Sequence, residues 1–269
     1  MVLTFFFFSF FTVAMGMVAK TARDAYFLSR FDKSILPLMF LAVAVVIAPI
    51  LTYYTKLSTK LAPRVLFMMT CAIFIVSFIL FQPLITGSVI PVVYIWVEVV
   101  VGIMLIQFWT FAGDSFEPQQ AKRLFSIIAG GGSFAVMIIG MNLKPFVNAF
   151  GTDELLFLAA GFLGLAGFFG LTSMQYFKKE PAKKGTLKPT KKGAKKKKEK
   201  QDPFLVGIGT IIALSAVVTT LIDYQFKMIA STAFPTEAEL VSFFGTFYSI
   251  AGAASIIMQF FITGPILSR

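Results

Sequence analysis

The chain has 269 residues, of which 57% are hydrophobic and 14% are charged, and its mean hydropathy is +0.83. Soluble domains carry about 25% charged residues and lack repeated apolar runs of twenty, so this composition excludes a water-soluble globular protein. Histidine is absent and Cys71 is the single cysteine, which excludes His-based catalysis, His/Cys metal sites and an internal disulfide framework. The net charge of +11 does not indicate a nucleic-acid partner, because twelve of the 24 Lys and Arg residues lie between positions 178 and 200.

Eight apolar stretches are long enough to cross a bilayer as helices, since about 20 residues at 1.5 Å each span ~30 Å of hydrocarbon. They cover residues 2–28, 35–54, 65–85, 89–112, 121–143, 154–177, 203–230 and 239–265. Their continuous apolar character disfavours transmembrane strands, which alternate. The predicted fold class is therefore an all-α polytopic membrane protein. A cleaved signal peptide is the alternative for the first stretch, but that stretch lacks a basic start and is better explained as a spanning helix.

The distribution of positive charge predicts the orientation. The loops after the second, fourth and sixth predicted helices carry seventeen Lys and Arg residues, whereas the loops on the other side carry three. Positively charged loops stay in the cytoplasm, so we expect a cytoplasmic N-terminus.

A Lys-rich segment at 178–202 divides the chain. It has almost no apolar side chains, so we expect a disordered cytoplasmic linker that lies near anionic lipid headgroups. Six helices in 1–177 and two in 203–269 fit the plan of a major-facilitator-like carrier built from two six-helix halves. On this interpretation the chain contains the N-terminal half and the first two helices of a C-terminal half, and the remaining C-terminal helices are missing from it.

Six charged residues fall inside the predicted spanning helices. They are Lys20, Arg23 and Asp24 in the first helix, Glu98 in the fourth, and Asp223 and Lys227 in the seventh. An ionised group at mid-bilayer costs about 3 kcal/mol on insertion scales, so each needs a partner or a water-filled cavity. Spacings of three and four residues place the first three on one helix face and pair Asp223 with Lys227. Glu98 has no charged neighbour on its own helix, so its partner must come from another one.

These charges occur on the first, fourth and seventh predicted helices. In a major-facilitator-like carrier each six-helix half consists of two groups of three helices, and this spacing is expected if the first helix of each group lines a central cavity. We therefore predict that all six residues form a substrate-binding site, in which the three cations attract an anion and the three carboxylates hold them when the site is empty. The alternatives are structural ion pairs between packed helices, and snorkelling of Lys20 and Lys227 toward the headgroups.

Other features have simpler interpretations. Glycines at 130–132 are predicted to interrupt the fifth helix, and glycines recur every third residue over 161–170; both sets are interpreted as surfaces for close helix packing. Trp96 and Trp109 suit either a membrane-interface belt or a cavity. No arrangement of side chains has the partners needed for catalysis, so we expect no enzyme activity, no cofactor and no metal.

Four segments of the chain resemble the nucleotide (ATP/ADP) translocase family, carriers related to the major facilitator superfamily. KTARD at 20–24 is similar to the family's first-helix signature, and YIWVE at 94–98 with FW at 108–109 resembles its fourth helix. AKRLF at 121–125 with the glycines at 130–132 resembles its fifth helix. LIDYQFK at 221–227, followed by FP at 234–235 and FG at 244–245, resembles its seventh and eighth helices.

The resemblance implies exchange of an anionic nucleotide across a bacterial inner (cell) membrane. It gives Arg23 a role in substrate contact and Glu98 and Asp223 the family's functional acidic positions. Arg23 stands where Lys is usual and Asp223 where Glu is usual. Two other functions remain open: a carrier of another solute with proton-coupling acids, and a membrane sensor or anchor for a lost soluble domain.

Overall fold

The computed structural model describes all residues except 86, 88, 117, 177–202, 260 and 262–269. The long helices in it are α1 (Val2–Arg30), α2 (Leu36–Ser58), α3 (Pro63–Phe81), α4 (Ile90–Ser115), α5 (Pro118–Phe150), α6 (Leu155–Ser173), α7 (Pro203–Ala233) and α8 (Glu237–Met258). Short 3₁₀ turns, η1 (Lys33–Ile35), η2 (Gln82–Leu84) and η3 (Met174–Tyr176), follow α1, α3 and α6. The described residues thus contain eight helices that are long and apolar enough to cross a membrane, which confirms the predicted all-α polytopic fold.

Local sequence explains where several helices begin and end. Pro63 and Pro91 occupy the first turns of α3 and α4, where the missing N–H has no intrahelical partner to lose. Thr236 caps α8 by accepting a hydrogen bond from the Glu239 backbone, and the Glu239 side chain accepts one from the Thr236 backbone in return. Gly151, with φ of +91°, makes the turn between α5 and α6 in a conformation that favours glycine.

The predicted interruption of the fifth helix is wrong, because α5 runs unbroken through the glycines at 130–132. In a membrane the backbone has no water to bond with, so a helix keeps its own hydrogen bonds even across glycines. Gly131 instead allows close packing on α1: a Cβ there would collide with the carbonyl oxygen of Phe6. The helix also continues to Phe150, so Lys144 lies within α5 and not in the following loop.

The interpretation of the glycine repeat in α6 is half right. Cβ atoms added at Gly167 and Gly170 would meet Cys71 and Phe67 of α3, so these two positions do serve close packing. Nothing lies within 4 Å of the same atom at Gly161 or Gly164. A side chain at these two positions would therefore meet no other helix in the part of the chain that the structure describes.

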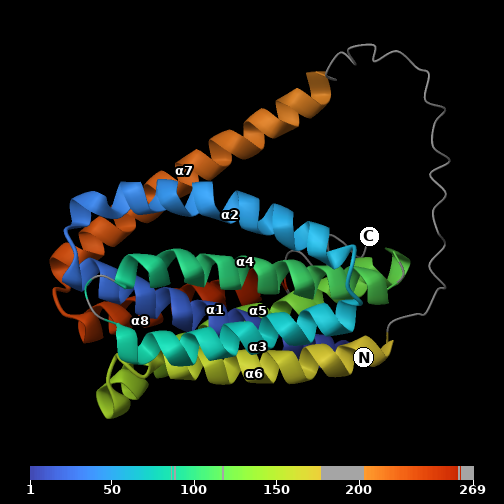
Figure 1. The fold of residues 1–269 in the computed structure, drawn as a ribbon, viewed down its shortest axis with the longest axis horizontal. Coiled ribbons are helices and arrows are strands. Elements are labelled where there is room, and N and C mark those ends of the chain that lie inside the picture. Colours follow the sequence, from blue (N-terminus) through green and yellow to red (C-terminus); the bar gives the residue numbers. More distant parts are fainter. Residues whose placement is uncertain (86, 88, 117, 177–202, 260, 262–269) are drawn as a thin grey trace.

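Helix α1 is the centre of the bundle and packs against α4, α5 and α6 (Figure 1). Helix α3 packs on α6, and α8 packs along α5. The long α1 stretch is buried from Phe5 to Leu28 on its inward faces, so it supplies much of the core.

Helix α7 projects from the bundle and meets it only near its C-terminal end (Figure 1). The side chains at 207–222 are all exposed. Further along, Phe226 packs against Phe247 of α8 with ring centroids 4.6 Å apart, and Lys33 donates a hydrogen bond to the Ser231 carbonyl at 2.7 Å.

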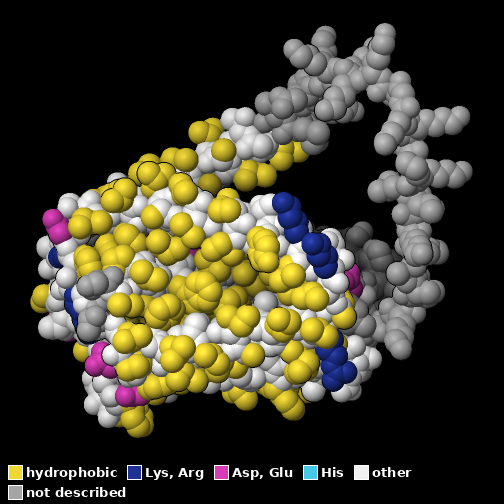
Figure 2. Space-filling view, viewed as in Figure 1, with side chains coloured by type: hydrophobic (Ala, Val, Ile, Leu, Met, Phe, Trp, Pro, Cys, Tyr) yellow, Lys and Arg dark blue, Asp and Glu magenta, His cyan; other side chains and the backbone are white. Residues whose placement is uncertain are grey.

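The surface is divided between apolar flanks and charged ends. Figure 2 shows apolar side chains over the flank and a row of Lys and Arg at the end where α2 gives way to α3, a segment that holds Lys56, Lys60 and Arg64. The predicted linker at 178–202 and the side chains of Lys122 and Arg123 lie outside the described residues, and the cytoplasmic N-terminus stays a prediction.

Candidate functional site

The six charged side chains singled out in the sequence lie together inside the bundle. Glu98 of α4 is the anion between the two cations of α1: its Oε2 lies 3.1 Å from Lys20 Nζ and its Oε1 lies 2.6 Å from Arg23 Nη2. The partner that Glu98 required from another helix is thus a pair of cations one turn apart.

Asp24 extends the same network from α1 to α7. Its Oδ1 lies 3.4 Å from Arg23 Nε and its Oδ2 lies 3.1 Å from Lys227 Nζ. Lys227 in turn lies 2.8 Å from Asp223 Oδ2, the ion pair that the four-residue spacing predicted. The side chains therefore form one chain of alternating charge, in the order Lys20, Glu98, Arg23, Asp24, Lys227 and Asp223.

The middle of this chain is buried and its ends are accessible. The side chains of Arg23 and Lys227 are each 4% exposed and that of Asp24 is 7% exposed, whereas Lys20 and Asp223 are 40% and 38% exposed. Buried charges are tolerated only when they are paired and hydrogen-bonded, so the arrangement neutralises itself in the absence of a ligand. We name these six residues the charge network.

Arg23 is held in place by α4. Its Nη1 donates to the Tyr94 carbonyl at 2.9 Å, and its guanidinium lies 4.2 Å from the centroid of the Tyr94 ring. Both contacts orient the planar group with its other edge toward Glu98. Arg23 Nε and Asp24 Oδ1 have no hydrogen-bond partner among the described residues, so one donor and one acceptor of the network remain available for further hydrogen bonds.

All six residues line one cavity of about 400 Å³ between α1, α4, α5, α7 and α8. The remaining walls come from Thr12, Val13, Gly16, Met17, Val101, Leu105, Val136 and Tyr248. A further cavity of about 390 Å³ reaches Arg23, Glu98 and Asp223 from the side of α2. The structure therefore brings the predicted residues together around one cavity, and their binding of a substrate stays a prediction.

A second polar group, which the sequence analysis left in loops, joins the ends of α1 and α8. Arg30 and Glu237 form a two-point ion pair, with Nε to Oε1 at 2.5 Å and Nη2 to Oε2 at 3.1 Å. Ser29 and Thr152 donate hydroxyl hydrogen bonds to the same carboxylate at 2.9 and 3.0 Å. We name Ser29, Arg30, Thr152 and Glu237 the end cluster.

The end cluster also fixes two loops. Arg30 Nη1 donates to the Ile85 carbonyl at 3.0 Å, and Tyr26 donates from its hydroxyl to the Thr152 carbonyl at 2.6 Å. The capping pattern of Thr236 and Glu239 could have located Glu237 in the first turn of a helix. Its pairing with a residue 207 positions away has no sequence signal in a single chain.

The fold and the cavity together define an integral multi-pass membrane protein with charged side chains converging inside its helical bundle. No family model matches the chain, and no solved structure matches it.

The chain is similar to curated proteins named ADP,ATP carrier protein 1. It is 21% identical over 204 residues to the one from Chlamydia pneumoniae, which covers 65% of this chain and 39% of that protein. It is 24% identical over 199 residues to the one from Chlamydia muridarum (strain MoPn / Nigg), covering 65% and 36%. A chloroplastic carrier of the same name from Arabidopsis thaliana is 25% identical over 226 residues, covering 76% and 33%.

The chain thus spans between a third and two fifths of the length of these relatives. At this level of identity the similarities support the nucleotide translocase family that the four sequence segments indicate. The chain is thus distantly similar to part of the ADP,ATP carrier proteins.

Proposed function

We propose that the protein is a membrane carrier that exchanges nucleotides of the ATP/ADP type by alternating access, without covalent chemistry. The observation that carries this proposal is the charge network, six ionised side chains from three helices that line one cavity. Charged groups inside a membrane protein usually mark the path of a substrate or ion. The similarity to named ADP,ATP carriers supports a nucleotide as that substrate.

Phosphate binds by exchanging partners within the network. Arg23 offers a planar fork suited to two-point contact with a phosphate, and Lys20 and Lys227 add mobile positive charge at its sides. Glu98 and Asp24 hold these cations at 2.6–3.1 Å. An arriving phosphate chain competes with the carboxylates for the same N–H groups, so binding loosens contacts between α1, α4 and α7.

This competition favours exchange over one-way flux. The network ties α7 to α1 through Lys227 and Asp24, and α1 to α4 through Arg23 and Glu98, so reorientation must break buried ion pairs. A bound nucleotide supplies the negative charge that the cations need while the carboxylates separate. The loaded carrier therefore reorients more readily than the empty one.

The end cluster supports alternation between two faces. It joins α1 to α8 at the end of the bundle opposite Lys56, Lys60 and Arg64, which is the outer end if the N-terminus is cytoplasmic. The arrangement described here is then closed outside, and opening the outer face requires the Arg30–Glu237 pair to separate.

The test is counterflow of labelled ATP by the full-length protein in proteoliposomes preloaded with unlabelled ATP or ADP. We expect uptake that depends on internal nucleotide and that unlabelled nucleotides inhibit better than a panel of small metabolites. Arg23→Ala should reduce uptake at least tenfold, Arg23→Lys should retain part of it, and the exposed Arg64→Ala should leave it unchanged. Uptake inhibited only by other solutes would favour a different carrier, and the absence of any solute flux would favour a sensor or anchor.

A further inference from the structure

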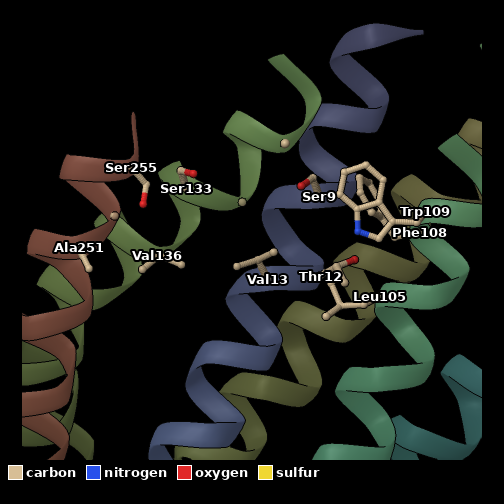
Figure 3. A pocket seen from close by; sticks show the side chains of 13 residues that line it. Ser9, Thr12, Val13, Leu105, Phe108, Trp109, Ser133, Val136, Ala251 and Ser255 are labelled. Atoms are coloured by element: carbon tan, nitrogen blue, oxygen red, sulfur yellow. The ribbon is translucent and has the colours of Figure 1, made fainter. Parts of the chain in front are cut away.

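A second cavity adjoins the charged one and has a different chemistry (Figure 3). Its volume is about 290 Å³, and α1, α4, α5 and α8 contribute its walls. The two cavities share four lining residues, namely Thr12, Val13, Leu105 and Val136. None of the residues lining the second cavity is charged; they are apolar or small, apart from two aromatic side chains and several hydroxyls. We name it the aromatic cavity.

The two aromatic side chains of this cavity, Phe108 and Trp109, differ in how much of their ring surface is exposed. Phe108 is 2% exposed and packs edge-on against Phe8 at 5.2 Å, so it forms part of a fixed wall. Trp109 contacts Phe108 at 5.1 Å between ring centroids but is 45% exposed. Phe125 also meets the indole edge-on at 5.9 Å. Because Trp109 lines the cavity and both of these neighbours meet it edge-on, a planar ring could stack on its indole. Trp96, in contrast, lies outside both cavities and donates from Nε1 to Ser77 at 2.8 Å.

Thr12 supplies an unused polar group at the boundary of the two cavities. It is 2% exposed, and its Oγ1 has no hydrogen-bond partner among the described residues. Helical threonines ordinarily satisfy themselves by donating to a carbonyl one turn back, as Thr110 does to Ile106 at 2.8 Å. A buried hydroxyl without such a bond is unfavourable unless a ligand or water completes it, so Thr12 points to a polar ligand here.

The separation of the two regions matches the length of a nucleotide. Thr12 precedes Lys20 by eight residues and Arg23 by eleven, which is about 12–17 Å along α1. A nucleoside di- or triphosphate has this extended length, with a planar uncharged base and a hydroxylated sugar at one end and all of its charge at the other. The two cavities present the same division of chemistry in the same order.

We infer that the aromatic cavity binds the base and ribose of the nucleotide whose phosphates occupy the charge network, with Trp109 stacking on the base and Thr12 bonding to the sugar. This inference rests on the proposed function. It places the base toward the N-terminal end of α1 and the phosphates toward its C-terminal end.

The experiment compares ATP with inorganic tripolyphosphate, which carries the phosphate chain without the nucleoside. In labelled-ATP counterflow by the full-length protein, Trp109→Ala should raise the KM for ATP about tenfold, the effect of losing one base–aromatic stack. Thr12→Val should raise it severalfold. The inhibition constant of tripolyphosphate should be the same in both variants as in the parent protein.

Conservative variants and a matched control keep the test informative. Trp109→Phe and Thr12→Ser retain the ring and the hydroxyl, so they should give smaller rises than Trp109→Ala and Thr12→Val. Trp96→Phe should leave both constants unchanged. An unchanged KM in Trp109→Ala and Thr12→Val, or an equal loss of ATP and tripolyphosphate affinity, overturns the inference while ATP exchange by the parent protein stands. If the parent protein exchanges no ATP, the proposed function fails, and the inference fails with it.

Discussion

The ammonium of Lys227 lies 3.1 Å from Asp24 Oδ2 and joins α7 to α1 inside the bundle. Both side chains are almost fully buried, whereas the part of α7 at 207–222 is exposed. The position of α7 therefore depends on a few contacts near its C-terminal end, and this ion pair is among them.

Removing the charge of Asp24 should loosen α7. Asp24→Asn leaves Lys227 with only Asp223 and weakens the neutralisation of Arg23, and an uncompensated buried charge costs about 3–5 kcal/mol. We expect a lower midpoint of thermal unfolding in detergent. The double variant with Lys227→Met should recover much of the loss, because it removes the unpaired cation. A single variant as stable as the parent protein would contradict this account of the pair.

Neutralising Glu98 should affect nucleotide binding and the exchange rate in opposite directions. Glu98→Gln releases Lys20 and Arg23 from their shared anion, so both cations become more available to phosphate. We expect a lower KM for labelled ATP together with a maximal exchange rate that is reduced at least tenfold, since the empty site then carries unpaired positive charge. Initial rates of counterflow over a range of ATP concentrations measure both quantities. An unchanged rate would instead match a structural or anchoring role for the network.

Breaking the end cluster should open the outer face. Glu237→Gln weakens the two-point pair with Arg30 and should expose the charged cavity more often. The readout is labelling of Met17→Cys, a cavity position, by a membrane-impermeant maleimide in a background where Cys71 is replaced. We expect labelling to accelerate severalfold. Glu239→Gln, two residues away and not in contact with Arg30, is the matched control; equal acceleration in both would rule out a specific role for the pair.

Filling the glycine contact between α5 and α8 should destabilise the bundle. A Cβ at Gly140 would lie 2.5 Å from the Gly245 carbonyl oxygen, which is backbone and cannot move away alone. We expect Gly140→Ala to cost about 1–3 kcal/mol, the usual effect of overpacking. Gly161→Ala, with nothing within 4 Å of the new atom, should be neutral or slightly stabilising. Thermal unfolding of the two variants side by side tests the contrast.

The sequence predicted the helices and the charge network well because both follow from the cost of polar groups in lipid. Apolar runs must be helical to satisfy their backbone, and intramembrane charges must find partners, so Glu98 required cations from another helix and has them in Lys20 and Arg23. Snorkelling of Lys227 is wrong: its side chain is 4% exposed and paired with two carboxylates.

What the sequence did not predict depends on which segments meet in space. The glycines of α5 and α6 all lie within apolar helices, yet Gly131 and Gly170 face neighbouring helices and Gly161 does not. Residues near helix ends, such as Arg30 and Glu237, carry charge that water can satisfy, so nothing in the sequence forces them to pair. The two halves of the proposed carrier and its linker at 178–202 remain predictions.

Helix α1 carries residues of both polar groups within a few turns. Asp24 belongs to the charge network and Arg30 to the end cluster, and six residues of helix place them only about 9 Å apart along the axis. Because α1 is one rigid helix with contacts at both positions, a small tilt that a ligand causes at Asp24 also displaces Arg30. Communication between the charge network and the end cluster then needs no relay of side chains, only the stiffness of one uninterrupted helix.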